Sequence, residues 1–257
     1  MKKLLLFLTL GAVSAFGQSV FNGTWRVNPD SAQIKGNDKY SLVGGVYRCE
    51  TCVPKITAKA DGKEHKVTGS PYEDMIKVSE PNDHSVEVTT IKGGKTVGGS
   101  KMTVSEDGKT LTTEWNFVSE SGKEGKGKFT SERVGDAPAG ANKVSGEWHA
   151  NKVEDASDSV STFTYQVNGD GISMSDPTGD SYTAKFDSKD YPYKGDPGTT
   201  SVSVKKIDDN TIEETDKRKG KVISVARMTV DADGKTMKIH IDDKLHGTVA
   251  DWTASKQ

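Results

Sequence analysis

The fold is decided by Met102-Thr103-Val104-Ser105-Glu106-Asp107-Gly108-Lys109-Thr110-Leu111-Thr112-Thr113-Glu114-Trp115-Asn116-Phe117. The Asp107-Gly108 pair is a hairpin turn signal, and the residues on either side of it alternate between apolar and polar. Leu111, Trp115 and Phe117 fall on one face of the segment, and Thr110, Thr112, Glu114 and Asn116 fall on the other. This period of two predicts an antiparallel hairpin with one buried and one solvated face.

The same pattern occurs a second time, 126 residues later, as residues 228–241. Without a gap, 20 of the 60 positions from Ile56 to Trp115 are identical to positions 182–241. Outside that span the offset is 123, so that Gly23-Thr24-Trp25 corresponds to Gly146-Glu147-Trp148. The chain is therefore interpreted as two copies of one unit, residues 18–134 and 143–257, joined by a linker of small residues at 135–142.

Each copy is predicted to be all-β. Turn signals recur, many of them 10–15 residues apart, and no stretch of 11 residues after the N-terminal segment has a convincing helical period. Roughly eight or nine strands in a copy of ~115 residues are most economically arranged as a closed sheet, because closure removes the unpaired edges. We expect two tandem antiparallel β-barrels, with a β-sandwich as the competing arrangement.

The N-terminus has the pattern of an export signal. Two lysines precede an apolar run, Leu4–Ala12, and small residues follow up to Gly17. A signal peptide over residues 1–17 is expected, with cleavage after Ala15 or Gly17. The apolar run is too short to span a bilayer, so no membrane span is expected, and the protein is expected to be exported, either periplasmic or extracellular.

Composition excludes some partners. The chain has 257 residues, 28% of them charged, but its 35 basic and 37 acidic side chains nearly balance. Loss of Lys2 and Lys3 with the signal peptide would leave a net charge of −4. No basic surface for nucleic acid is therefore predicted.

Two motifs resemble a known family. Each copy opens with Gly-x-Trp, and the later Val104–Leu111 motif is typical of a family of exported bacterial domains. The openings resemble the signature of lipocalin-like, or calycin-type, β-barrels. The resemblance implies that both tryptophans pack structurally near the closed end of a barrel. The structural signature of the two copies is Gly23, Trp25, Asp107 and Gly108 with Gly146, Trp148, Asp233 and Gly234.

Cys49-Glu50-Thr51-Cys52 is the most visible candidate for chemistry. A C-x-x-C pair can be a redox pair, half of a metal site or, in an exported protein, a local disulfide. Twelve residues separate Cys52 from His65, a spacing found in zinc fingers, but no fourth ligand follows at a suitable distance. The second copy has Ser175, Thr178 and Tyr191 at the three equivalent positions, so a disulfide is favoured.

No catalytic or metal-binding set is predicted, and no cofactor. The five histidines form no recognisable set with a nucleophile, and the many carboxylates single out no pair. The aspartates of the hairpins are most simply turn formers. The aromatic residues are interpreted mainly as core, although they could line a cavity. They are Trp115, Phe117, Phe163, Tyr165, Tyr182, Tyr191 and Tyr193.

Three functions follow as hypotheses. The favoured one is an exported, non-enzymatic binding protein for a small or apolar ligand in a barrel interior. The alternative is a structural or interaction module of the cell envelope with solid cores. The third is a thiol–disulfide redox protein acting through Cys49 and Cys52. The oligomeric state and the ligand are left open.

Overall fold

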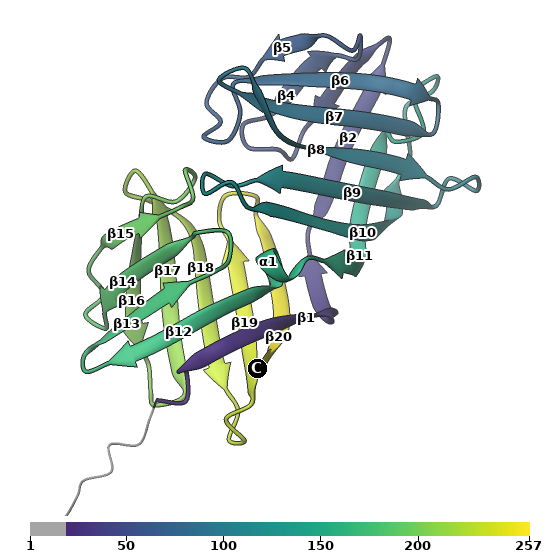
Figure 1. The fold of residues 1–257 in the computed structure, drawn as a ribbon. Coiled ribbons are helices and arrows are strands. Elements are labelled where there is room, and N and C mark those ends of the chain that lie inside the picture. The colour runs from purple at the N-terminus through teal and green to yellow at the C-terminus, as the bar shows by residue number, and fades with distance from the viewer. Residues whose placement is uncertain (1–18) are drawn as a thin grey trace, which may run out of the picture.

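The computed structural model describes residues 19–257, and the expected signal peptide lies outside them. Strands dominate the described chain, because its alternating sequence leaves one apolar face on each strand to be buried. The strands form two antiparallel ten-stranded sheets, each curved into a barrel (Figure 1). The expectation of two antiparallel β-barrels is confirmed. In the described part of the chain, the one helix has four residues, too few to cross a membrane.

The first sheet closes completely, and we call it the closed barrel. Its strands, in order around the barrel, are β1 (Gly23–Lys35), β12 (Thr162–Asn168), β13 (Gly171–Ser175), β14 (Ser181–Lys185), β15 (Tyr191–Lys194), β16 (Ser201–Lys206), β17 (Thr211–Arg218), β18 (Lys221–Val230), β19 (Thr236–Asp243) and β20 (Thr248–Lys256). Strand β1 closes the barrel because it pairs with β12 on one side and with β20 on the other.

The second sheet is nearly closed, and we call it the second barrel. Its strands, in order, are β4 (Ile56–Lys59), β3 (Val46–Cys49), β2 (Asn37–Val43), β11 (Gly146–Ala156), β10 (Glu124–Gly135), β9 (Thr110–Val118), β8 (Lys95–Val104), β7 (Ser85–Lys92), β6 (Met75–Asn82) and β5 (Glu64–Lys66). The two short strands β4 and β5 form its edges, which limits the exposed backbone.

The barrels exchange their first strands. Strand β1 comes from the first half of the chain but belongs to the closed barrel, where Trp25 lies opposite Phe163 of β12. Strand β11 begins the second half but lies in the second barrel, where Trp148 lies opposite Asp38 of β2. The barrels in space therefore differ from the copies in the sequence, 18–134 and 143–257, because each contains one strand from the other copy.

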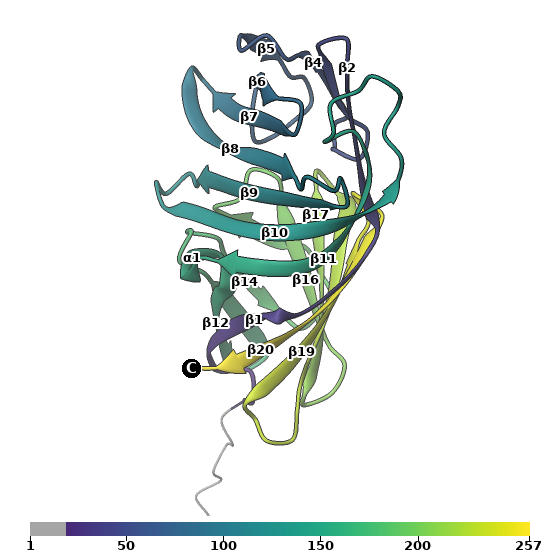
Figure 2. The ribbon, with the colours of Figure 1, turned by 90° about the vertical axis from the view of Figure 1, so that its right-hand side faces the viewer.

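Two connections carry the chain between the barrels. Figure 2 shows β1 leaving the closed barrel and continuing upward as β2. Gly36 joins these strands with φ +134°, and a Cβ there would lie 2.5 Å from Cγ2 of Thr248, so a side chain is excluded. The second connection is α1 (Asp158–Ser161), which joins β11 to β12 between the two barrels (Figure 1).

Each barrel has its own apolar core, and each core is built around a tryptophan of the exchanged strand. Trp25 and Trp148 are both 0% exposed. The indole N–H of Trp25 donates to the carbonyl of Phe21 at 2.8 Å, and that of Trp148 donates to the carbonyl of Val144 at 2.9 Å. Both indoles are thus fully buried with their polar atom satisfied, which makes each a rigid anchor for the incoming strand.

Candidate functional site

The candidate site is a cavity of about 570 Å³ that extends from the interior of the closed barrel to the junction with the second barrel. Its volume is within the range of about 300–1,000 Å³ that is usual for small-molecule sites. Most of its walls are apolar or aromatic. The lining residues are Val27, Pro29, Trp115, Phe129, Val153, Ala156, Val160, Ser161, Phe163, Tyr165, Met174, Asp176, Glu214, Asp216, Ser224, Ala226, Met228, Ile239, Ile241 and Trp252.

Both barrels contribute to this cavity. The closed barrel supplies most of the wall, and the second barrel supplies Trp115 from β9, Phe129 from β10, and Val153 and Ala156 from β11. Helix α1 adds Val160 and Ser161 at the junction. The exchange of β1 and β11 therefore helps to build the site. It brings helix α1 and strands β9, β10 and β11 of the second barrel next to the interior of the closed barrel.

Glu214 is the central polar residue of the cavity. It lies on β17, and only 8% of it is exposed. Tyr182 on β14 donates a hydrogen bond of 2.5 Å to its Oε2 atom, and Tyr165 on β12 donates to the same oxygen at 3.3 Å. Because both tyrosines serve Oε2, neither of them occupies Oε1.

Asp216 is the second carboxyl group on β17, two residues further along and hence on the same face. Its Oδ2 accepts a hydrogen bond of 2.9 Å from the Ser224 hydroxyl on β18. Its Oδ1 is completely buried and has no hydrogen-bond partner among residues 19–257. A buried carboxylate oxygen without a donor is costly, so this atom requires an explanation.

The environment changes the acidity of both groups. Burial raises the pKa of Glu214, and the nearby charge of Asp216 raises it further. Burial also raises the pKa of Asp216, while the hydrogen bond from Ser224 acts in the opposite direction. Burial and the charge of Glu214 raise the pKa of Tyr165 and of Tyr182, so both phenols stay protonated as donors.

The fold does not require these carboxyl groups. At the offset of 126, Glu214 and Asp216 correspond to Val88 and Thr90 of the second barrel, and Ser224 corresponds to Gly98. Val88 packs against the apolar core of its barrel. One barrel therefore has an apolar and a hydroxyl side chain where the other has two acids.

Glu214 and Asp216 were not among the predicted site residues, because acidic residues are abundant in the sequence. A signal was present: the alternation that buries Ile212 places Glu214 and Asp216 on the same, inward face. The same two positions also differ between the copies, which have Val88 and Thr90 in the first and Glu214 and Asp216 in the second.

Two glycines of β10 position aromatic residues at the junction. Gly125 lies opposite Phe117 in the strand pair, and Gly127 lies opposite Trp115. A Cβ at Gly127 would lie 2.5 Å from Cζ2 of Trp115, so the glycine leaves the space that the ring occupies. The rings of Trp115 and Phe117 stack at 6.1 Å, and Trp115 reaches the cavity. Among the aromatic residues interpreted mainly as core, Trp115, Phe163 and Tyr165 are lining residues.

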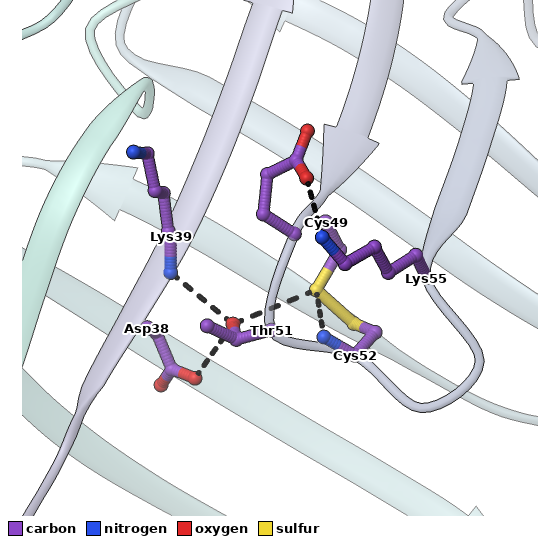
Figure 3. Close-up of a disulfide and its surroundings, with 7 residues drawn as sticks. Asp38, Lys39, Cys49, Thr51, Cys52 and Lys55 are labelled. Carbon is purple, nitrogen blue, oxygen red and sulfur yellow. Dashed lines mark hydrogen bonds and ion pairs between the residues drawn. A yellow bond between two sulfur atoms is a disulfide. The ribbon is translucent and has the colours of Figure 1, made fainter. Parts of the chain in front are cut away.

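Cys49 and Cys52 form a disulfide between the end of β3 and the following loop (Figure 3). Cys49 is only 2% exposed, whereas Cys52 is partly exposed. The amide of Cys52 donates to Sγ of Cys49 at 3.1 Å, and the Thr51 hydroxyl donates to Asp38 at 3.3 Å. The disulfide closes a small loop in the second barrel and does not line the cavity.

The histidines lie apart from this cavity. His65 is paired with Asp61, His240 with Asp251 and His246 with Asp243, each on the surface or partly exposed. Nδ1 of His84 donates a hydrogen bond to the Val104 carbonyl at 3.2 Å, and Nδ1 of His149 donates one to the Gly36 carbonyl at 3.1 Å. Within residues 19–257, no group of three or more His, Cys, Asp or Glu side chains could hold a metal ion.

The signature residues have structural roles. Asp107 accepts a hydrogen bond from the amide of Lys109, and Asp233 accepts one from the amide of Lys235. Each aspartate thus stabilises its hairpin turn, and the following glycine has the positive φ that the turn needs, +73° at Gly108 and +66° at Gly234. Gly23 and Gly146 also have positive φ, just before the buried tryptophans.

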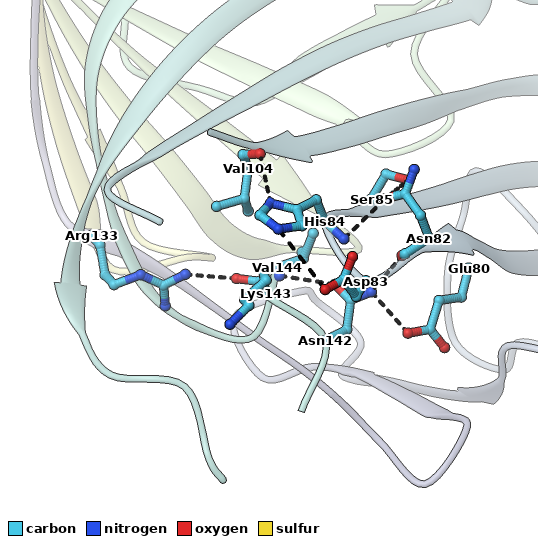
Figure 4. Close-up of polar contacts among 10 residues, drawn as sticks. All are labelled: Glu80, Asn82, Asp83, His84, Ser85, Val104, Arg133, Asn142, Lys143 and Val144. Atoms are coloured by element: carbon cyan, nitrogen blue, oxygen red, sulfur yellow. Dashed lines mark hydrogen bonds and ion pairs between the residues drawn. The ribbon is translucent and has the colours of Figure 1, made fainter. Parts of the chain in front are cut away.

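The end of the second barrel where Trp148 is buried is closed by a polar network (Figure 4). Asn142 donates to Glu80 and to the carbonyl of Asn82, both at 2.9 Å. Arg133 donates to the carbonyl of Lys143 at 2.6 Å, and its other nitrogens donate to Ser145 and Gly108. These contacts secure the linker after β10 to the end of the barrel.

No protein-family model matches the chain, and no curated protein matches it either. The function is therefore inferred from the geometry of the cavity.

Proposed function

We propose that this chain is a non-enzymatic binding protein that holds one small, mainly apolar ligand in the closed barrel. The observation that carries the proposal is the cavity of about 570 Å³, whose walls are mostly apolar and aromatic. Burial of apolar surface would supply the affinity, at about 25 cal/mol per Å² removed from water before the costs of binding are subtracted. The few polar groups on β17 and β18 would orient the ligand.

The expected stoichiometry is one ligand per chain. The cavity of the closed barrel has mostly apolar and aromatic walls, whereas the open pocket of about 590 Å³ in the second barrel is lined in part by charged residues, among them Glu87, Lys101 and Lys128. The export signal expected in residues 1–17 would place this binding activity in the periplasm or outside the cell. The packed second barrel would then serve to complete the site through Trp115, Phe129 and Val153.

The redox hypothesis has less support. Cys49 is almost fully buried and Cys52 is only partly exposed, and the second copy has Ser175 and Thr178 in place of the two cysteines. The disulfide is therefore proposed to act as a local cross-link. The packed core cluster of the second barrel supports the envelope-module hypothesis. A module with two solid cores is not expected to contain the cavity of the closed barrel.

The test is native mass spectrometry of the mature protein, purified gently from its own host. One small molecule retained per chain is expected. In vitro, N-phenyl-1-naphthylamine, a neutral apolar fluorophore, should bind at one site per chain. A clean ligand-free mass together with no fluorophore binding would contradict the proposal and favour the envelope module.

A pair of variants locates the binding. Ala226→Phe adds a ring to the cavity wall and should weaken fluorophore binding at least tenfold. Ser41→Phe is the control, because Ser41 lies on β2 of the second barrel, opposite Arg48 of β3, and does not line the cavity. Circular dichroism should show that both variants fold. Equal losses in the two variants would contradict a site in the closed barrel.

A further inference from the structure

All the ionisable side chains with charge near neutral pH that line the cavity are acidic. Three acidic residues line it, Asp176, Glu214 and Asp216, and its lining contains no lysine, arginine or histidine. Asp176 is occupied by its own loop, since its Oδ1 accepts hydrogen bonds from the amides of Thr178, Gly179 and Asp180. Glu214 and Asp216 are thus the two carboxyl groups of the cavity that the surrounding backbone does not use.

Protein donors satisfy this pair only in part. The tyrosine hydroxyls and the Ser224 hydroxyl serve one oxygen of each carboxyl group, Oε2 of Glu214 and Oδ2 of Asp216. The buried Oδ1 of Asp216 has no donor among residues 19–257. Ionisation of both carboxyl groups is unfavourable because the lining of the cavity supplies no cation to compensate them, and burial raises the pKa of Glu214 so that it keeps a proton in the ligand-free protein.

We propose that the ligand is an amphipathic amine, with an ammonium group held by Glu214 and Asp216 and an apolar body against the aromatic and aliphatic wall. This inference rests on the proposed function of the cavity. An ammonium group has three donors and no acceptor, which complements Oε1 of Glu214, the cavity-lining carboxyl oxygen that neither tyrosine occupies. Its charge would also compensate the pair, and charge-assisted hydrogen bonds are the stronger kind.

The wall of the cavity fits the rest of such a ligand. Phe163 and Trp252 offer aromatic faces, and Val27, Ile241 and Ala226 offer aliphatic surface. An aromatic face also attracts a cation, which adds to the preference for an amine. An anionic ligand of the same shape would meet two acidic groups with no base to offset them, and a neutral alcohol would bring no positive charge to favour their ionised form.

The experiment compares 4-phenylbutylamine, 4-phenylbutanol and 4-phenylbutanoate by isothermal titration calorimetry on the mature protein at pH 7.5. The three probes share one apolar body and differ only in the end group. The amine should bind roughly 10- to 100-fold more tightly than the alcohol, given the usual strength of hydrogen bonds to charged groups. The carboxylate should bind most weakly.

The double variant Glu214→Gln/Asp216→Asn tests whether this pair causes the preference. It should bind the amine and the alcohol within about threefold of each other, because the acceptors lose their charge but keep their size. Glu213→Gln is the matched control: Glu213 is next to Glu214 on β17 but pairs with Arg227 at 2.8 Å and does not line the cavity. It should keep the preference.

The outcomes separate the two proposals. Equal binding of all three probes would overturn the amine inference but leave an apolar binding site in place. No binding of any probe, and none of N-phenyl-1-naphthylamine, would overturn the proposed function as well. A preference for the amine that survives in the double variant would place the cation elsewhere and overturn the assignment to Glu214 and Asp216.

Discussion

Arg133 stacks on Trp148, with its guanidinium carbon 4.0 Å from the centroid of the indole ring. The closed barrel has a matching contact, in which Nζ of Lys256 lies 5.0 Å from the ring of Trp25. The two cations are 123 residues apart, the same offset that relates the two tryptophans. The side chain of Lys256 donates one hydrogen bond, to the carbonyl of Val20 at 2.9 Å, whereas the side chain of Arg133 donates to three carbonyl groups.

This difference predicts unequal effects of substitution. Arg133→Ala should lower the free energy of unfolding by roughly 2–4 kcal/mol, since it removes three hydrogen bonds and a cation–π contact. Lys256→Ala should cost only about 1 kcal/mol, for one hydrogen bond and a longer contact. Urea denaturation followed by tryptophan fluorescence measures both. Equal costs would show that the carbonyl contacts of Arg133 add nothing to stability.

The strand exchange predicts that a cut chain stays together. A protease site inserted between Ala139 and Gly140, both exposed, would divide the chain within the linker. After cleavage, β1 remains paired with β12 and β20, and β11 remains paired with β10 and β2. The two fragments should co-elute in size-exclusion chromatography at the position of the intact protein and separate only in denaturant. Separation in native buffer would contradict the exchange.

The buried acids predict a dependence of stability on pH. Burial raises the pKa of Glu214 above the ordinary glutamate value of 4.5, so the folded protein keeps a proton that the unfolded chain releases. Stability from this group is therefore fully present below about pH 4.5, and it is lost as the pH rises toward the folded-state pKa of about 8. Glu214→Gln removes this loss. The difference in unfolding free energy, variant minus wild type, should increase by at least about 1 kcal/mol from pH 5 to pH 8, because a tenfold difference in proton affinity is worth about 1.4 kcal/mol.

Asp216→Asn should have a similar effect of smaller size, because the hydrogen bond from Ser224 partly offsets the burial of that carboxyl group. Urea titrations at several pH values measure both variants, and Glu213→Gln again serves as the control. A flat difference between pH 5 and pH 8 for Glu214→Gln would mean that its carboxyl group is as acidic in the folded protein as in the unfolded chain.

The disulfide predicts a modest contribution to stability and no exchange activity. Cys49→Ala/Cys52→Ala should fold and lose at most roughly 2 kcal/mol, because so short a loop restricts the unfolded chain only slightly. Wild-type protein should not accelerate the reduction of insulin by dithiothreitol, since Cys49 is buried. Acceleration that disappears in the double variant would instead support the redox hypothesis.

The sequence by itself determined the local structure. A period of two and regularly recurring turn pairs depend only on neighbouring residues, so they were sufficient to predict antiparallel hairpins such as β8–β9 around Asp107 and Gly108. The likeness of residues 56–115 and 182–241 pointed to two similar units. Closure of the sheets then followed from the need to remove their edges.

Only the tertiary structure decided which strand completes which barrel. Both copies open with Gly-x-Trp, so either first strand has the residues to anchor in either barrel, and the choice depends on how the chain crosses at Gly36 and at α1. The cavity was equally hidden, although alternation already points Glu214 and Asp216 inward. Whether a barrel interior is filled depends on the summed volumes of side chains from many strands, which are far apart in the sequence and meet only in the folded protein.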